Sequence, residues 1–267
     1  IDTHTHIFAD DLAQRALTAL TAELPADNKI TPEHNATLNG LLAHLDKYNI
    51  SKAVALSIAT KPQQTPRINQ WAIETTKISN RRVLCSGAAH YEYSDLENEF
   101  KKLRDNKITV IKLHPEYQYF CPLHSKLEKL FYCAQDYGIK IYFHAGRDIA
   151  YLGSRSNPKI LSKFIKKYNK LTVIAAHLGS FELWDDTYNY LAGENIYLDT
   201  GFTIGYISDE KLLNIIEKHG ADKILFATDS PWVDTAKYVS YFKNLPLDDI
   251  KKSKILWQNA EKLFWQE

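Results

Sequence analysis

The chain has 267 residues, is 45% hydrophobic and carries a formal net charge of +1, which is ordinary for a globular protein. The near-neutral charge gives no support to a nucleic-acid partner or an anionic membrane surface, and no stretch is long and apolar enough to span a membrane. Three cysteines without a CxxC pair favour reduced thiols and a cytoplasmic protein, and the opening residues are expected to be folded structure rather than a signal peptide.

Short β-rich runs alternate with amphipathic helical patterns from one end of the chain to the other. Strands are predicted at 1–7, 52–59, 82–90, 108–114, 139–146, 171–179, 196–201 and 223–229. Helices are predicted at 36–48, 66–78, 94–105, 125–137, 158–168, before 191, at 208–219 and from 230 onward. A capping box of Ser94 and Glu97 is expected to begin the third helix, and Gly138 to end the fourth. Residues 8–35 form a long excursion with no predicted element.

Eight strand–helix units in regular alternation predict a parallel sheet with crossover helices. Eight such units close into a (β/α)8 barrel, of the α/β class known as the TIM barrel. An open doubly wound sheet is the alternative, but no GxGxxG pattern follows the first strand. Because no linker or composition break divides the chain, we predict a single domain over 1–267. The lysines 163, 166, 167 and 170 are spaced like the solvated face of a helix.

Polar residues suited to metal binding end most of the predicted strands. Catalytic groups of such barrels come from these carboxyl ends, and residues two apart on a strand share a face. Imidazoles together with a carboxylate predict a transition-metal site, best suited to Zn²⁺ and less specifically to Fe, Mn or Co. Zinc lowers the pKa of its bound water to about 7, which supplies hydroxide at neutral pH. The strand-end residues are His4, His6, Lys112, His114, His144, His177, Asp199 and Asp229, whereas His34, His44, His90, His124 and His219 are expected to be structural.

The ordered motifs resemble those of the amidohydrolase superfamily, and most closely its "amidohydrolase 2" family, which includes relatives of aminocarboxymuconate-semialdehyde decarboxylase. The motifs are "DTHTH", "KLHPEYQ", "FHAG", "AAHLG" and "ATDSPW", and together they cover almost the whole chain. The resemblance implies a (β/α)8 barrel with one divalent transition metal, most simply zinc, at the carboxyl ends of the strands. It implies that the metal ligands are His4, His6, His144 and Asp229.

The resemblance also implies catalytic roles for His177 and Asp229. His177 matches the sixth-strand histidine that polarises the substrate or moves protons, and Asp229 matches the aspartate that takes a proton from the attacking water. Lys112 matches the lysine that bridges two metals in binuclear members once carboxylated, so a second metal stays open. We favour one metal, with the Lys112 ammonium paired with a carboxylate of the protein or of the substrate.

Further substrate-binding candidates follow from their positions after strand ends. Arg147 could bind a carboxylate through its guanidinium fork, or form a surface ion pair with Asp148. Trp184 and Trp232 are large enough to wall a pocket or to serve packing alone. The predicted substrate-binding residues are Lys112, His114, Glu116, Arg147 and Trp232.

Four candidate functions are compatible to different degrees with these residues. The main expectation is metal-dependent hydrolysis of an amide, lactone or ester-like bond in a small-molecule substrate. The alternative is metal-dependent, non-oxidative decarboxylation of a small unsaturated or aromatic acid. A nuclease of the TatD kind is disfavoured by Lys112 and by the charge balance, and a non-catalytic barrel by the intact strand-end set. Substrate specificity is expected to lie in 8–35 and 117–124, and a homodimer is compatible because relatives commonly dimerise.

Overall fold

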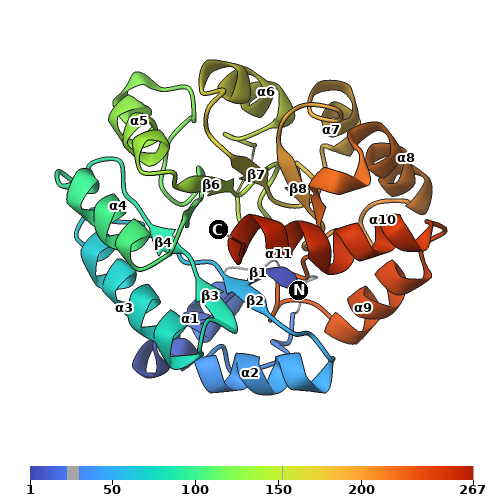
Figure 1. The fold of residues 1–267 in the computed structure, drawn as a ribbon, viewed down its shortest axis with the longest axis horizontal. Helices are drawn as coiled ribbons and strands as arrows, with labels where there is room; N and C mark the ends of the chain where they lie inside the picture. The colour runs from blue at the N-terminus through green and yellow to red at the C-terminus, as the bar shows by residue number, and fades with distance from the viewer. Residues whose placement is uncertain (23–29, 152, 267) are drawn as a thin grey trace.

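The structure is a computed structural model that describes residues 1–22, 30–151 and 153–266. Within these residues the strands are all parallel and form a ring that helices surround, as Figure 1 shows along the barrel axis. One sheet has the order β1 (Asp2–Thr5), β2 (Ala53–Ala55), β3 (Val83–Cys85). The other has the order β4 (Gly87–Ala88), β5 (Val110–Leu113), β6 (Lys140–Phe143), β7 (Val173–Ala175), β8 (Tyr197–Asp199), β9 (Ile224–Leu225).

Backbone hydrogen bonds join the two sheets into a closed barrel. The Thr3 amide donates to the Phe226 carbonyl at 3.0 Å, and the Asp229 amide donates to the His4 carbonyl at 2.8 Å. The chain leaving β9 therefore lies beside β1. On the other side, Ser86 separates β3 from β4, and its amide donates to the Ala55 carbonyl at 2.7 Å. The predicted third strand thus contributes both segments, with β3 paired to β2 and β4 to β5.

The helices follow the strands in the predicted alternation. They are α1 (Asp10–Ala22), α2 (Leu38–Lys47), α3 (Gln64–Ile78), α4 (Leu96–Asp105), α5 (Glu128–Asp136), α6 (Pro158–Lys167), α7 (Trp184–Tyr190), α8 (Asp209–His219), α9 (Thr235–Asn244), α10 (Asp249–Ser253) and α11 (Asn259–Phe264). Among the described residues, no helix is both long and apolar enough to cross a membrane.

Helix α6 shows how local sequence sets these elements. The Asn157 side chain accepts a hydrogen bond from the Ile160 amide at 3.1 Å, and Pro158 occupies the first turn, where its missing N–H costs nothing. The apolar side chains face the barrel and the lysines face water, as their spacing predicts. The buried set is Leu161, Phe164 and Ile165, and the exposed set is Lys163, Lys166 and Lys167.

Three local expectations are wrong. Helix α1 lies in the excursion 8–35, where none was predicted, although its apolar residues have helical spacing; only Ala13 and Leu17 of it are buried, and residues 23–29 of the excursion lie outside the described residues. The capping box of Ser94 and Glu97 does not form, because α4 begins at Leu96 after Asp95, which makes no side-chain cap hydrogen bond. The strands are also shorter than predicted, since residues at the strand ends leave the sheet to form the loops.

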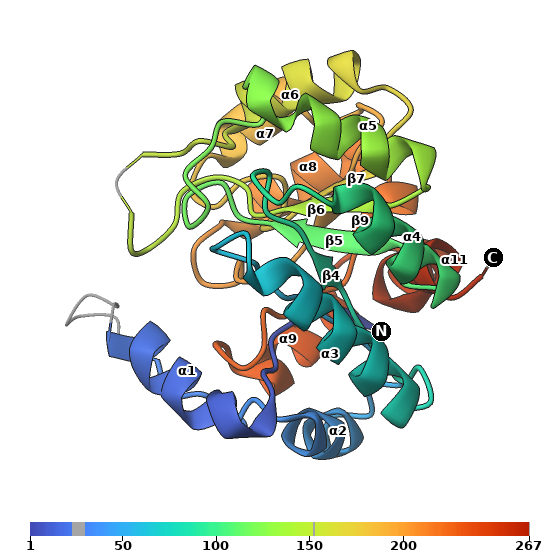
Figure 2. The ribbon, with the colours of Figure 1, turned by 90° about the vertical axis from the view of Figure 1, so that its left-hand side faces the viewer.

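The two ends of the barrel differ. Helix α11 crosses the barrel near the start of the chain in Figure 1, and Asn259 Nδ2 donates to the carbonyls of Ala221 and Ile224 at 2.6 and 2.8 Å, at the entry to β9. The C-terminal helices therefore cover the amino-terminal ends of the strands. Figure 2 shows α1 on the opposite side, beside the loops that leave the strands. This second end stays open to a cavity.

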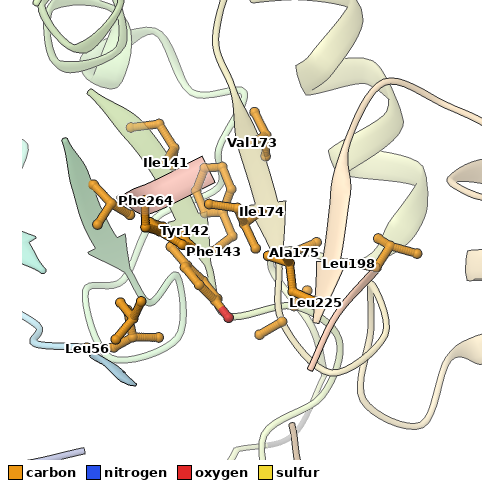
Figure 3. Packing of buried hydrophobic residues seen from close by; sticks show 14 of the residues in the cluster. Leu56, Ile141, Tyr142, Phe143, Val173, Ile174, Ala175, Leu198, Leu225 and Phe264 are labelled. Carbon is orange, nitrogen blue, oxygen red and sulfur yellow. The ribbon is translucent and has the colours of Figure 1, made fainter. Parts of the chain in front are cut away.

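Large side chains fill the barrel interior beneath that open end. Figure 3 shows Tyr142 of β6 among buried residues of the neighbouring strands. Tyr142 pairs in register with Lys112 of β5, and the Lys112 ammonium lies 4.8 Å from the centre of the Tyr142 ring, a distance typical of a cation–π contact. Both side chains are almost fully buried. These two side chains lie in the barrel interior directly beneath the strand-end residues, at the floor of the cavity.

Candidate active site

A cavity of about 620 Å³ opens at the carboxyl ends of the strands. Its inner wall carries polar residues from β1, β5 and the chain that follows β6, β7 and β9. These are His4, His6, Lys112, His114, His144, His177 and Asp229. The fold therefore brings these strand-end side chains together in one cavity, as the sequence predicts.

His4, His6 and Asp229 come together most closely. His6 Nε2 lies 2.9 Å from Asp229 Oδ1, and His4 Nε2 lies 3.3 Å from the same oxygen. In the described residues, these three form one of the groups whose ligand atoms all lie within 4.8 Å of one another. Imidazole nitrogen with carboxylate oxygen is a donor set that suits Zn²⁺ and other divalent transition metals.

The outer nitrogen of each of these histidines is already committed. His6 Nδ1 donates to the Leu56 carbonyl at 3.1 Å, and His4 Nδ1 donates to Asp199 Oδ2 at 2.9 Å. A neutral imidazole carries one proton, so both Nε2 atoms present lone pairs to Asp229. These three hydrogen-bond acceptors then face each other, and the Lys112 ammonium lies 3.3 Å from His4 Nε2. Such a cluster fits a cation between its members.

His144 and His177 repeat this arrangement beside the first group. His144 Nε2 donates to the Arg147 carbonyl at 3.0 Å, and His177 Nδ1 donates to the Gly201 carbonyl at 2.9 Å. The remaining atoms, His144 Nδ1 and His177 Nε2, lie 3.1 Å apart. Two lone pairs at this distance repel unless they share a proton or a cation. His144 therefore contacts His177, and His177 in turn lies next to the group of His4, His6 and Asp229. The ring centres of His177 and His4 are 5.3 Å apart.

Burial favours the neutral form of His4 and of His144. Desolvation, helped by the nearby Lys112 ammonium, lowers the pKa of His4 to about 4. Desolvation also lowers the pKa of His144 well below its usual range. For Lys112, desolvation lowers the pKa to about 8, although Asp199 and Asp229 act to raise it. Neutral imidazoles are the form that binds metals, so the electrostatics of the cavity floor suit ligation.

Asp199 anchors the centre from below, and sequence reasoning assigned it no role. The fully buried carboxylate accepts hydrogen bonds from His4 Nδ1, from the Tyr142 hydroxyl, and from the amides of His177 and Gly201 at 2.9 and 2.7 Å. Burial acts to raise its pKa, but His4, His177 and Tyr142 outweigh burial and hold the pKa well below its usual range. Its place at the end of the seventh strand is the signal that could have identified it.

His114 lies on the side of the site next to His144. The two rings stack with centres 4.0 Å apart and an interplanar angle of 12°. His114 Nε2 is 3.3 Å from Asp148 Oδ2, and Nδ1 accepts a long hydrogen bond from the Tyr117 amide at 3.4 Å. Asp148 is therefore the partner of His114, and not of Arg147.

The other predicted substrate-binding residues take different positions. Arg147 lines the cavity but is about half exposed and pairs with Glu182 at 3.3 Å, so its expected pair with Asp148 does not form. Trp232 also lines the cavity. Glu116 is buried outside the cavity lining and accepts from Arg155 Nε at 3.1 Å and from the Arg155 amide at 2.5 Å. Its carboxylate is thus occupied in holding a loop.

Aromatic side chains flank the polar centre. Phe181 and Phe202 line the cavity with ring centres 5.7 Å apart, and Phe181 lies 6.3 Å from the His177 ring. Trp184, considered above as a pocket wall, is instead buried, and its Nε1 donates to the His177 carbonyl at 3.0 Å. It therefore positions the backbone of His177, while the two phenylalanines form the wall.

Gly146 sets the path of the chain after His144. Its φ is +87°, and a Cβ there would lie 2.0 Å from the Phe181 amide nitrogen, far inside van der Waals contact. We expect Gly146→Ala to lower the free energy of unfolding by about 3 kcal/mol or more, because a backbone contact cannot yield as a side chain does. Chemical denaturation measures this difference.

Gly138 provides the matched control. Its φ is +64°, and a Cβ there would meet no atom within 4 Å. Gly138→Ala should therefore cost only the conformational strain, about 1 kcal/mol. Equal losses in the two variants would contradict the close approach at Gly146.

Together, fold and site define an α/β barrel that presents a buried cluster of histidines and aspartates at the carboxyl ends of its strands. The chain matches the amidohydrolase family (Amidohydro_2) over residues 1–265 and belongs to it. In sequence it is 30% identical over 123 residues to a γ-resorcylate decarboxylase from a Polaromonas species, a match that covers 39% of this chain and 37% of that protein. The match therefore spans little more than a third of this relative's length.

Solved structures share the fold over nearly the whole chain. An uncharacterised TIM-barrel protein from Bordetella bronchiseptica superposes with a TM-score of 0.79 at 18% identity, covering 99% of this chain and 98% of that one. A 5-carboxyvanillate decarboxylase from Novosphingobium aromaticivorans, with bound manganese and a nitrobenzoic acid, has a TM-score of 0.73 at 14% identity, covering 99% and 96%. Other similar folds include 2,6-dihydroxybenzoate decarboxylases and a probable 2-pyrone-4,6-dicarboxylic acid hydrolase. These likenesses confirm the single-domain TIM barrel.

Proposed function

We propose that this protein is a divalent-metal-dependent, non-oxidative decarboxylase of a small aromatic carboxylic acid. The observation that carries the proposal is the set of facing lone pairs of His4, His6 and Asp229, with His144 joined to this group through His177, beside the phenylalanine wall. The first feature suits a metal that binds a carboxylate, and the second suits an aromatic ring. The γ-resorcylate decarboxylase and the manganese-containing 5-carboxyvanillate decarboxylase among the relatives support this reading.

The metal-binding residues in this proposal are His4, His6, His144 and Asp229. A bound divalent metal supplies positive charge that orients the acid's carboxylate and an adjacent hydroxyl. Zn²⁺ and Mn²⁺ both suit nitrogen and oxygen ligands, and manganese is the ion bound in the 5-carboxyvanillate decarboxylase. Lys112 stays an ammonium beneath the site, where it balances Asp199 and Asp229.

The chain's own residues carry the proton transfer. Phe181 and Phe202 hold the ring beside His177, whose Nε2 faces the cavity because Nδ1 is fixed on the Gly201 carbonyl. His177, once it has taken up a proton at Nε2, transfers that proton to the ring carbon that carries the carboxylate. The bond between that carbon and the carboxylate then breaks, carbon dioxide leaves, and the bonding electron pair returns to the ring. Water then returns a proton to His177 Nε2, and the hydroxide left behind combines with the carbon dioxide to give bicarbonate, so atoms and charge balance.

Arg147 and Trp232 complete the proposed substrate site. Both line the cavity. A ring substituent that reaches Arg147 would exchange with Glu182 for the guanidinium, at the cost of a solvent-exposed ion pair that contributes little.

Hydrolysis is the second candidate, and Asp229 is the residue that favours it. Its carboxylate lies at the centre of the metal-type group and borders the cavity. In this position it can accept a proton from a water molecule that attacks an amide, lactone or ester carbonyl. His177, with a proton taken up at Nε2, would then donate a hydrogen bond to the oxygen on which negative charge develops.

A turnover screen separates the two candidates. We expect protein loaded with manganese or zinc to release carbon dioxide from 2,6-dihydroxybenzoate or 5-carboxyvanillate, and to leave a panel of lactones and amides unchanged. Elemental analysis should find about one equivalent of divalent metal, and removal of that metal by a chelator should abolish turnover and its re-addition restore it. Hydrolysis of the panel without release of carbon dioxide would replace decarboxylation by the second candidate. Full activity of metal-free protein would overturn both.

A further inference from the structure

The cavity continues beyond the polar centre into an apolar outer part. We call this part the outer chamber and define it by Leu12 of α1, Ile58 of the loop after β2, and Ile68 and Trp71 of α3, which all line the cavity. Ile68 and Trp71 are three residues apart and share a helix face. The outer chamber thus has one wall from α1, a helix outside the regular strand–helix alternation, and one from α3.

The cavity is much larger than a single ring requires. Its volume is about 620 Å³, whereas a cavity of about 150 Å³ is enough to bind benzene. A benzene ring with a carboxylate and a hydroxyl would fill only the polar centre between Phe181, Phe202 and His177. The outer chamber would then hold water against apolar side chains, which is an unfavourable arrangement.

The chemistry of the outer chamber indicates what fills it. Its defining side chains are aliphatic and aromatic; the polar residues Asp11 of α1 and Gln64 and Arg67 of α3 also line the cavity, and Asp11 and Arg67 are exposed. Leu12, Ile68 and Trp71 are each only partly buried by the protein itself. A ligand that covers them removes apolar surface from water, which is worth about 25 cal/mol per Å².

We propose that the substrate is an aromatic acid with an apolar substituent of several carbon atoms. The ring lies at the polar centre, and the substituent occupies the outer chamber against Leu12, Ile68 and Trp71. This inference rests on the proposed decarboxylase function for the ring and its carboxylate. It adds the class of substrate, because the relatives' named substrates carry no such chain.

Binding of two product-like resorcinols tests this proposal. With the manganese-loaded protein, isothermal titration calorimetry compares 5-methylresorcinol with 5-pentylresorcinol, which differ by four methylene groups. We expect the pentyl compound to bind roughly 100-fold more tightly, because burial of each methylene group raises the affinity about threefold. Trp71→Ala should reduce this ratio roughly tenfold, and so should Leu12→Gln on the facing helix. The two variants change opposite walls, so misfolding of one leaves the other as a test.

Two control variants separate the outer chamber from general hydrophobic binding. Trp257 is 49% exposed in the π-helical segment Lys254–Gln258 before α11 and does not line the cavity, and Trp257→Ala should leave the ratio unchanged. Arg67→Gln should also leave it unchanged. Equal affinities for the two resorcinols, or a ratio that survives Trp71→Ala and Leu12→Gln, would overturn the outer-chamber assignment. A retained pentyl preference without release of carbon dioxide from any aromatic acid would overturn the decarboxylase proposal and leave the outer chamber as an apolar binding site.

Discussion

Asp229→Asn is expected to lower kcat/KM by about a thousandfold or more. Asp229 Oδ1 lies between His6 Nε2 at 2.9 Å and His4 Nε2 at 3.3 Å, so the charge of this carboxylate is directed at the atoms that would share a metal with it. An amide keeps the shape but loses the negative charge. Removal of one group that binds or transfers a proton at a reacting centre typically costs about 10²- to 10⁴-fold. Release of carbon dioxide under steady-state conditions measures the loss.

Three measurements make this result specific. Circular dichroism and thermal unfolding should show that Asp229→Asn keeps the fold, and elemental analysis should show reduced metal content. The matched control is Asp222→Asn, which changes a carboxylate that is 71% exposed and paired with Lys254 on the surface. This control should retain wild-type activity and metal. Near-wild-type turnover of Asp229→Asn would remove Asp229 from the proposed centre.

Asp199→Ala has the largest expected effect on stability. The variant would leave His4 Nδ1, the Tyr142 hydroxyl and the amides of His177 and Gly201 without their acceptor in the barrel interior. Breaking a buried charged network by removal of one partner costs about 3–5 kcal/mol. We expect a decrease of this size in the free energy of unfolding, measured by chemical denaturation of the metal-free protein.

Asp199→Ala should also weaken metal binding. Without Asp199, the His4 ring is no longer fixed in the tautomer that presents Nε2 to Asp229. Loss of a partner that orients a ligand typically costs about 10- to 100-fold in metal affinity. Asp222→Ala is the control, and its surface pair should contribute less than about 1 kcal/mol. A stable Asp199→Ala variant with unchanged metal affinity would contradict the anchoring role.

The geometry of the centre explains why a stable fold can hold so many unpaired acceptors. Outer nitrogens of four histidines donate to Leu56, Asp199, Arg147 and Gly201, so each ring is held in place by the barrel frame. The inner nitrogens are left directed at one another. This arrangement fixes the orientation of each ring, and its cost is electrostatic repulsion between the inner nitrogens in the cavity. A bound cation would relieve that repulsion, which links metal binding to stability.

Much of the fold could be predicted from the sequence because its signals are local. Apolar runs of strand length and helices of 3.6-residue period alternate along the chain, and eight such units have one common closed solution. The same alternation places His4, His6, Lys112 and His144 at the carboxyl ends of strands. Two local expectations were wrong: α1 is helical where no element was predicted, and Ser94 loses the cap position because the backbone turns one residue later, at Asp95.

The sequence by itself thus determined the barrel and the histidines and aspartates at its strand ends, since strand periodicity and element order suffice for both. Only the tertiary structure decided which of these residues touch. His4 and Asp199 are separated by 195 positions and Tyr142 and Asp199 by 57, and no spacing rule connects them. The same holds for Glu116 with Arg155, for Arg147 with Glu182, and for the meeting of α1 and α3 around the outer chamber. Such contacts follow from closure of the ring, because closure brings distant strand ends within hydrogen-bonding distance.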